Sequence, residues 1–398
     1  MKIWLCKQGE TIPITQNSRI YRVGMLAKYL RKNNHEVIWW TSKFDHNTKR
    51  FLEEFDELPD GTKMKYLNGI AYKKNLSVQR ILNHHQMGVN FSNEAGNMLE
   101  NEKPDIIYVS MPTLDFAYRS VKFGKENSIK TIVDIRDLWP DVFLDLIPLR
   151  FLRKETFLMP WNKKLKYVLK NASLVVGITD EYIKWAQNKV KPFMLKNTIT
   201  LPLGYTEIDL NKIEENENRK FTISFAGTIG QHFDLATIFK VAKRLEKENI
   251  HFNILGSGDL LENYKGIYGE LKNISFYGWV NQDKITEVLL NSDLGIAPYK
   301  NTINFINNIP NKPYEYLAHG LPILTCLTGA TRNLLKTQNV GYFYEEGNVD
   351  SLIKEIIKIL DNKEDLLRKK NNSKLVFREN YSSDIIYSRF VEIIEEIL

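Results

Sequence analysis

The chain has 398 residues, which is too many for one typical hydrophobic core, so two domains are expected. Its two cysteines, Cys6 and Cys326, both lie in apolar runs, which favours buried thiols over a disulfide framework. The net charge is +7, but residues 1–205 carry +11 and the remainder carries −4. The basic half is therefore expected to meet an anionic partner: a phosphate-bearing molecule, an anionic membrane or nucleic acid.

The N-terminal apolar run ends at Lys7, too early for a signal peptide. Elsewhere, no apolar run approaches the roughly 18 residues that a membrane-spanning helix requires. These two observations predict a cytoplasmic protein.

Short apolar runs alternate with helical patterns along both halves of the chain, which predicts parallel sheets with helical crossovers. In the first half, strands are expected at 3–6, 36–40, 106–110, 131–135 and 174–178, with helices near 19–33, 91–102, 113–127, 159–170 and 179–188. In the second half, strands are expected at 222–226, 251–255, 274–277, 293–297 and 323–325, with helices near 233–248, 258–271, 281–291, 312–319 and 329–336.

The polar run 211–220 separates the two patterns and predicts a linker. We therefore expect an α/β protein with a Rossmann-like domain at 1–205 and a second at 206–380. Ligands in such sheets bind at the carboxyl ends of the strands, here in a cleft between the domains. The segment 47–92 has no clear periodicity and is expected to be an insertion near that cleft.

Residues 310–323 read Pro-Asn-Lys-Pro-Tyr-Glu-Tyr-Leu-Ala-His-Gly-Leu-Pro-Ile, which predicts a short helix before a buried strand. Lys312 and Glu315 are three residues apart and share one face of that helix. The carboxylate can accept hydrogen bonds from ribose hydroxyls, and the lysine can face phosphate. A nucleotide diphosphate fits this pattern, and an ordinary helix with a capping acid is the alternative.

Glycine-containing turns follow several strands of the second half. The turn Gly227-Thr228-Ile229-Gly230 lets the backbone approach a diphosphate, although a tight strand–helix turn is the alternative. Near Val280, a backbone group is expected beside the nucleotide base. Thr328 and Gly329 open another helix and are expected to offer N–H groups to phosphate or sugar.

In the first half, Asp134, Arg136 and Asp137 end a predicted strand. The Arg136 guanidinium would neutralise a diphosphate leaving group or bind an acceptor phosphate, and Asp137 would orient the acceptor or accept its proton. The alternative is a structural Arg–Asp pair. His46 is expected to face the acceptor, whereas His84, His85 and His319 are expected to be structural.

These segments together resemble retaining GT-B glycosyltransferases of family 4. The stretch 310–323 resembles their donor site, Asp134-Ile-Arg-Asp-Leu-Trp-Pro-Asp-Val-Phe143 resembles a block of members that build bacterial surface polysaccharides, and Glu36–His46 resembles their opening βαβ unit. The resemblance implies transfer of a hexosyl or N-acetylhexosaminyl group from a UDP-sugar to a lipid-diphosphate-linked saccharide. It also implies a C-terminal helix, 381–398, that crosses back to the first domain, and attachment to the inner face of the cell membrane.

The resemblance extends to particular donor residues. Gly256 would line the nucleotide side of the cleft, and Glu315 matches the second of two family glutamates, whereas the first position holds Asn307. The basic residues that many members place after the glycine turn are absent here, so Lys300 and Lys312 are expected to replace them. No Asp-x-Asp motif is present to hold a metal on the diphosphate, so neither a metal nor another cofactor is expected.

Three other functions remain open from the sequence. A nucleotide-sugar epimerase can share this fold, and a pI near 9 is compatible with nucleic-acid binding. No nucleic-acid-binding motif is present, however, so nucleic acid is not expected as a partner. Gly256-Ser-Gly258 resembles a dinucleotide fingerprint, but Leu261 replaces its third glycine, so a dehydrogenase is disfavoured.

The segment 146–170 interleaves large apolar residues with cations, and Pro148 and Pro160 interrupt it. Amphipathic pieces on an anionic membrane, with Arg150, Arg153, Lys163 and Lys164 at the surface, are one interpretation. A packed helix pair whose lysines face water is the other.

Overall fold

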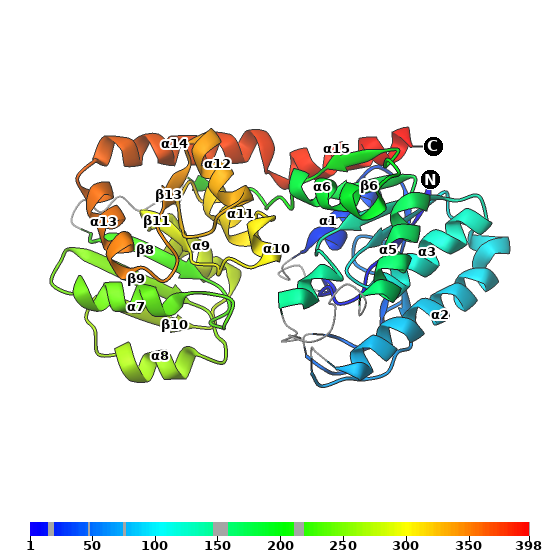
Figure 1. The fold of residues 1–398 in the computed structure, drawn as a ribbon, viewed down its shortest axis with the longest axis horizontal. Helices are drawn as coiled ribbons and strands as arrows, with labels where there is room; N and C mark the ends of the chain where they lie inside the picture. Colours follow the sequence, from blue (N-terminus) through cyan, green and yellow to red (C-terminus); the bar gives the residue numbers. More distant parts are fainter. Residues whose placement is uncertain (15–19, 47, 75–76, 146–157, 211–218, 398) are drawn as a thin grey trace. The chain divides into compact units, whose positions relative to one another are not determined.

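The computed structural model describes residues 1–397 except 15–19, 47, 75–76, 146–157 and 211–218. The chain forms two compact units (Figure 1). Unit 1 consists of Met1–Pro202 together with Tyr387–Leu398, and unit 2 is Leu203–Ile386. The division that we predicted from the sequence, at 205/206 and 380/381, differs from this one by a few residues.

Unit 1 contains a fully parallel seven-stranded sheet in the order β3-β2-β1-β4-β5-β6-β7. Its strands are β1 (Lys2–Cys6), β2 (Glu36–Ser42), β3 (Lys63–Leu67), β4 (Ile106–Ser110), β5 (Lys130–Ile135), β6 (Leu174–Gly177) and β7 (Thr198–Thr200). Its helices are α1 (Arg22–Lys32), α2 (Val78–Glu102), α3 (Leu114–Glu126), the 3-10 helix η1 (Asp141–Asp145), α5 (Met159–Asn171) and α6 (Asp180–Val190).

Unit 2 contains a fully parallel six-stranded sheet in the order β10-β9-β8-β11-β12-β13. The strands are β8 (Phe221–Ala226), β9 (Ile250–Leu255), β10 (Ile274–Gly278), β11 (Leu294–Ala297), β12 (Ile323–Thr325) and β13 (Gly341–Phe343). The helices are α7 (Leu235–Arg244), α8 (Leu261–Tyr268), α9 (Gln282–Leu290), α10 (Ile303–Ile306), α11 (Asn311–Ala318), α12 (Ala330–Gln338), α13 (Val349–Leu360) and α14 (Lys363–Asn380).

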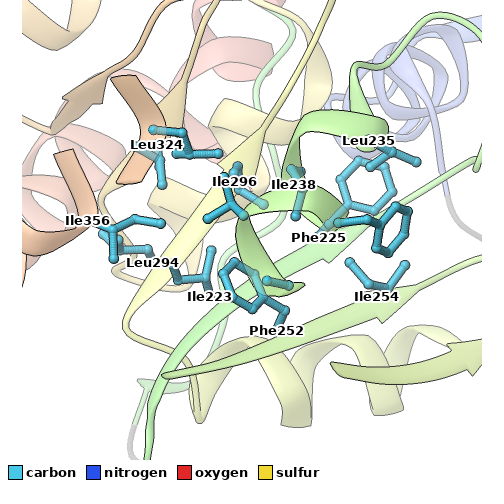
Figure 2. Packing of buried hydrophobic residues seen from close by; sticks show 14 of the residues in the cluster. Ile223, Phe225, Leu235, Ile238, Phe252, Ile254, Leu294, Ile296, Leu324 and Ile356 are labelled. Carbon is cyan, nitrogen blue, oxygen red and sulfur yellow. The ribbon is translucent and has the colours of Figure 1, made fainter. Parts of the chain in front are cut away.

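The core of unit 2 shows why these residues form a layered α/β structure. Residues of β8, β9 and β11 point at apolar side chains of α7 and α13 in one continuous cluster (Figure 2). Helix α13 contributes Leu352, Ile356 and Ile359, which lie on one face because they are four and three residues apart. A second cluster on α9, α11, α12 and α14 packs on the rest of the sheet. Parallel strands buried on both faces explain the continuous apolar runs in the sequence.

The last helix, α15 (Ser383–Glu396), begins in unit 2 and ends in unit 1. Within unit 1 the Tyr387 ring lies 5.6 Å from that of Tyr29, and the Phe390 ring lies 5.9 Å from that of Tyr108. Farther along, Glu395 pairs with His35 at 2.8 Å. The end of the chain is thus part of the unit 1 core.

The predicted α/β class with two parallel sheets is confirmed, and the predicted strands match the observed ones within one or two residues. The predicted start of the helix at residue 91 was wrong, because α2 begins at Val78, where the Ser77 side chain accepts a hydrogen bond from the Arg80 N–H. The segment 47–92, predicted to be an insertion, contains β3 and the first half of α2. Most of the predicted linker, 211–220, lies outside the described residues.

Candidate functional site

At the carboxyl end of the unit 2 sheet, the loops after β8, β9 and β10 are joined by backbone hydrogen bonds. The Gly227 N–H donates to the Leu255 carbonyl at 2.9 Å, and the Gly256 N–H donates to the Gly278 carbonyl at 2.7 Å. Gly256 has a φ of +127°, and a Cβ there would overlap the Gly227 carbonyl oxygen. Glycine is therefore required at position 256 by both backbone conformation and space.

Within the described chain, the N–H groups of Thr228 and Gly230 make no hydrogen bond, and Thr228 is exposed. Two donors in one exposed turn can bind an anion. The sequence predicted a helix near 233–248 after this turn, and the observed helix begins two residues later than predicted. Helix α7 begins at Leu235, and the Asp234 side chain caps it by accepting from the Thr237 N–H at 3.4 Å. Any anion at Thr228–Gly230 would thus contact the turn rather than a helix N-terminus.

Lys312, in the first turn of α11, reaches this same edge of the sheet. Its side chain is buried, and its Nζ donates a hydrogen bond to the Ala226 carbonyl, at the end of β8. The Nζ lies 4.4 Å from the centroid of the Phe225 ring, and a Cβ on Gly227 would occupy its position. Lys312 thus places a positive charge directly beside the Gly227–Gly230 turn.

Glu315 lies one turn farther along α11 and is also buried. Its Oε1 accepts a hydrogen bond from the Tyr205 hydroxyl at 2.8 Å, and that hydroxyl accepts one from Gln282 Nε2 at 3.0 Å. Among the described residues, no donor bonds to Oε2 of Glu315. The carboxylate is therefore held through one oxygen, which leaves Oε2 able to accept a further hydrogen bond.

The remaining predicted donor residues are distributed around this edge. Lys300 is exposed directly after β11, and Val280 packs on the cluster of Ala226, Leu255 and Val288. Asn307 caps α10, and its Nδ2 donates to the Ile303 carbonyl at 2.7 Å.

Thr328 and Gly329 immediately precede α12. The Thr328 N–H and hydroxyl, which we expected to contact a ligand, both donate to Asn301 Oδ1, at 2.8 and 2.6 Å. Gly329 is the N-cap residue of α12. Thr328 is thus used within the fold, as part of the Thr328–Asn301 pair.

At the carboxyl end of the unit 1 sheet, the predicted Arg–Asp motif is divided between two separate ion pairs. Asp134 is fully buried and pairs with Arg22 of α1 at 2.8 Å, while the Tyr108 hydroxyl donates to it at 2.5 Å. Arg136 instead pairs with Glu10 at 2.9 Å. The other Glu10 oxygen accepts from the N–H groups of Val23 and Gly24, and so caps α1. Arg136 therefore forms an ion pair within the fold, and its partner is Glu10 rather than the aspartate of the predicted alternative.

Asp137 is half-buried at the end of β5, and it affects the pKa values of Lys7, Arg80 and Tyr182. It is thus electrostatically coupled to two cations, Lys7 and Arg80, that the sequence analysis did not select.

His46, after β2, makes a hydrogen bond of 2.7 Å through Nδ1 to the Tyr72 hydroxyl. Burial, followed by the charges of Arg80 and Lys49, lowers the pKa of His46 to about 4. The imidazole is thus neutral at pH 7, and its Nδ1 is engaged with Tyr72.

Sequence reasoning missed Tyr205, Gln282, Lys7 and Arg80 at these two sheet edges. Tyr205 is 110 residues from Glu315, and no periodic signal links the two. Lys7 offered a signal, because it is a charged residue that directly follows a buried strand at the edge where Rossmann-like sheets bind ligands.

Residues 206–376, most of unit 2, match the family of glycosyl transferases group 1. No curated protein sequence gives a significant match. Sucrose-phosphate synthase from Thermosynechococcus elongatus superposes with a TM-score of 0.72 at 13% identity, covering all of this chain and 98% of that one. A glycosyltransferase from Rickettsia africae gives a TM-score of 0.71 at 13% identity, again covering all of this chain and 98% of that one.

Anabaena HepE in complex with UDP gives a TM-score of 0.64 at 12% identity, with both chains fully covered. These structural likenesses establish the fold, which is GT-B. Together, the family match and the fold support a GT-B glycosyltransferase. The segment that matches the glycosyl transferase family lies within unit 2.

Proposed function

We propose that the chain is a retaining glycosyltransferase that moves a sugar from a UDP-sugar to a lipid-diphosphate-linked saccharide in surface polysaccharide assembly. The observation that carries this proposal is the position of Lys312 and Glu315 in successive turns of α11, beside the Thr228–Gly230 turn. The solved complexes of Anabaena HepE with UDP and with UDP-glucose support a UDP-sugar, since that protein has the same fold.

In the proposed donor complex, Oε2 of Glu315 accepts a hydrogen bond from the ribose hydroxyls, and Tyr205 keeps the carboxylate oriented. The diphosphate lies against the N–H groups of Thr228 and Gly230, with the Lys312 ammonium close by. Amide donors and a fixed cation stabilise the leaving diphosphate as its charge develops. We propose that neither a metal nor another cofactor takes part.

The acceptor part of the proposal rests on the family resemblance. The acceptor hydroxyl attacks on the same face of the sugar from which the diphosphate leaves, and a phosphate oxygen or Asp137 takes its proton. His46 is neutral at pH 7 and would orient the acceptor rather than carry charge. Arg136 would act indirectly, by holding Glu10 and the start of α1 in place.

We also propose that the protein lies on the cytoplasmic face of the cell membrane. No helix in the described part of the chain is long and apolar enough to cross a bilayer. Within 146–170, residues 146–157 with Arg150 and Arg153 lie outside the described residues, and Lys164 is paired with Asp115. The membrane proposal is therefore argued here from other residues of unit 1.

A second surface of unit 1 also suits a membrane. Phe193 and Met194 are 49% and 78% exposed in the loop between α6 and β7. Two lysines of α5 flank them, and the Nζ atoms of Lys166 and Lys170 lie 5.5 and 3.3 Å from the Phe193 ring centroid. We name these four residues the basic apolar patch. Exposed apolar side chains beside cations favour the interface of an anionic bilayer.

Product analysis tests the proposal. The protein would be incubated with UDP-sugars and a polyprenyl-diphosphate saccharide, with and without EDTA, and the products followed by NMR. We expect a new glycosidic bond with the anomeric configuration of the donor, formed equally well in EDTA. Inverted configuration, or loss of activity in EDTA that manganese restores, would contradict the mechanism. Conversion of the UDP-sugar without an acceptor would favour the epimerase instead.

A further inference from the structure

The loop after β1 holds a buried cation that the proposed donor site does not use. Lys7 is 7% exposed, and its backbone is fixed because its N–H donates to the Trp40 carbonyl at 3.0 Å. Among the described residues, no group forms a hydrogen bond or ion pair with its Nζ. An ammonium group without a bonded partner on a side chain this deeply buried is costly, which favours a ligand at this position.

The same loop packs against the start of α2. Gln8 Nε2 donates to Asn83 Oδ1 at 2.6 Å, and Asn83 is fully buried. Arg80 lies three residues before Asn83 and four before His84, so it shares a face of α2 with each of them. The Arg80 guanidinium lies 5.3 Å from the ring centroid of Trp139, which is four residues beyond the end of β5. The loop after β1, the start of α2 and the end of β5 therefore converge at this edge.

The loop after β2 completes the enclosure. A Cβ on Gly9 would lie 3.4 Å from the His46 Cβ, so the two loops are in contact. Lys49 donates through Nζ to the His46 carbonyl at 2.6 Å, and its Nζ lies 4.9 Å from the Tyr72 ring centroid. Three cations, Lys7, Lys49 and Arg80, all lower the pKa of His46, so they gather around this imidazole at the carboxyl end of the sheet.

The electrostatics of this position agree with an excess of positive charge. Burial, then the charge of Arg80, lowers the pKa of His84 to about 3, and Lys7 lowers it further. Burial, then the charge of Arg136, lowers the pKa of Lys7 to about 8. The nearby carboxylates of Glu10 and Asp134 are already paired, with Arg136 and Arg22. Asp137 is a further neighbouring acid, which raises the pKa of Lys7, and Asp45 accepts from Thr48.

We propose that Lys7, Arg80 and Lys49 form an anion subsite in unit 1 that binds a phosphate group of the acceptor. This inference rests on the proposed function in one respect, namely that the acceptor carries phosphate. A diphosphate offers the charge and the acceptor oxygens that an ammonium and a guanidinium bind best. The subsite lies wholly within unit 1, and its residues are distinct from those of the donor site on α11.

Calorimetric titration with inorganic pyrophosphate tests the subsite. Saturating UDP would be present, at a concentration set by a separate titration, so that a diphosphate site in unit 2 is filled. We expect wild type to bind pyrophosphate under these conditions, and Lys7→Met and Arg80→Gln each to weaken that binding at least tenfold. Lys28→Met, which removes an exposed lysine of α1, is the matched control and should bind like wild type.

Two results would overturn the subsite. Either pyrophosphate binding disappears when UDP is present, which would assign the anion to the donor, or Lys7→Met and Lys28→Met bind it equally well. Failure of the proposed function would look different: UDP would then not bind wild type at all, while the effect of Lys7→Met on pyrophosphate would persist.

Discussion

The Tyr205 hydroxyl donates a hydrogen bond of 2.8 Å to Oε1 of Glu315, across 110 residues of sequence. Gln282 in turn donates to the same hydroxyl at 3.0 Å. The pair fixes the carboxylate on which the proposed donor site depends, so Tyr205 is a positioning residue that need not touch the substrate.

Tyr205→Phe should therefore weaken UDP binding several-fold, because a lost hydrogen bond to a carboxylate costs about 1.5–3 kcal/mol and the remaining contacts recover part of it. Calorimetry with UDP measures the effect. Tyr277→Phe on strand β10 is the control, since Tyr277 is 37% exposed. Equal UDP affinity in the two variants would show that the Tyr205 hydroxyl does not orient Glu315 for binding.

Gly256→Ala should destabilise unit 2 and abolish UDP binding. The new Cβ would overlap the Gly227 carbonyl at a φ of +127°, and such strain costs on the order of 1–3 kcal/mol. Gly266→Ala is the matched control, because it lies in α8 with nothing within 4 Å of its Cβ, and it should stabilise the helix by up to about 1 kcal/mol. Urea denaturation of both variants would reveal the contrast, and similar unfolding midpoints would contradict it.

Lys7→Met should make the protein more stable, and the gain should depend on pH. Burial lowers the pKa of folded Lys7 to about 8 from its usual 10.5, so the folded state binds its proton less tightly than the unfolded state. Below pH 8 the free energy of unfolding of the wild type is therefore reduced by the full penalty of burying a charged Lys7, on the order of 3 kcal/mol. The penalty disappears as the pH rises from 8 to 10.5.

Urea denaturation of wild type and Lys7→Met at pH 7, 8, 9 and 10 measures that difference directly. We expect the free energy of unfolding of the variant to exceed that of the wild type by the most at pH 7 and by progressively less at higher pH. A constant gap, or a wild type that is more stable at pH 7, would show that Lys7 is not a buried, destabilised cation.

Replacing Phe193 and Met194 of the basic apolar patch with serine should release the protein from vesicles that contain phosphatidylglycerol. Burying a large apolar side chain contributes about 1.5–3 kcal/mol, so loss of two should reduce binding strongly. Ile267→Ser is the control, since it removes a side chain that is 62% exposed but lies in unit 2. Equal sedimentation of all three proteins with vesicles would exclude this patch as the membrane contact.

The sequence was most informative where periodicity is local. Start and stop signals at Pro313, Gly320 and Pro322 placed Lys312 and Glu315 on one helix, and continuous apolar runs predicted most strands of both sheets. Strand β3 was missed. It has no continuous apolar run, and its only signal is an alternation of lysines with more buried residues, which is typical of an edge strand. Segments without strong periodicity, such as the start of α2, were correspondingly misread.

Partners distant in sequence could not be predicted. Asp137 is the nearest acid to Arg136 in the chain, yet Arg136 pairs with Glu10, which lies 126 residues away. The position of Glu10 depends on the packing of α1 against the sheet, and no residue spacing encodes that packing. For the same reason, Tyr205 and the convergence of Lys7 with Arg80 emerge only from the fold.

The most direct test of the account is calorimetric titration of UDP into wild type and Glu315→Ala. If α11 presents the nucleotide site, wild type should bind UDP and Glu315→Ala should bind it 10- to 100-fold more weakly, since a charge-assisted contact contributes about 1.5–3 kcal/mol. Glu287→Ala, which removes a 60% exposed carboxylate of α9, should bind like wild type, and circular dichroism should show that all three are folded. UDP affinity that is the same in Glu315→Ala and wild type, or no UDP binding to wild type, would contradict the account.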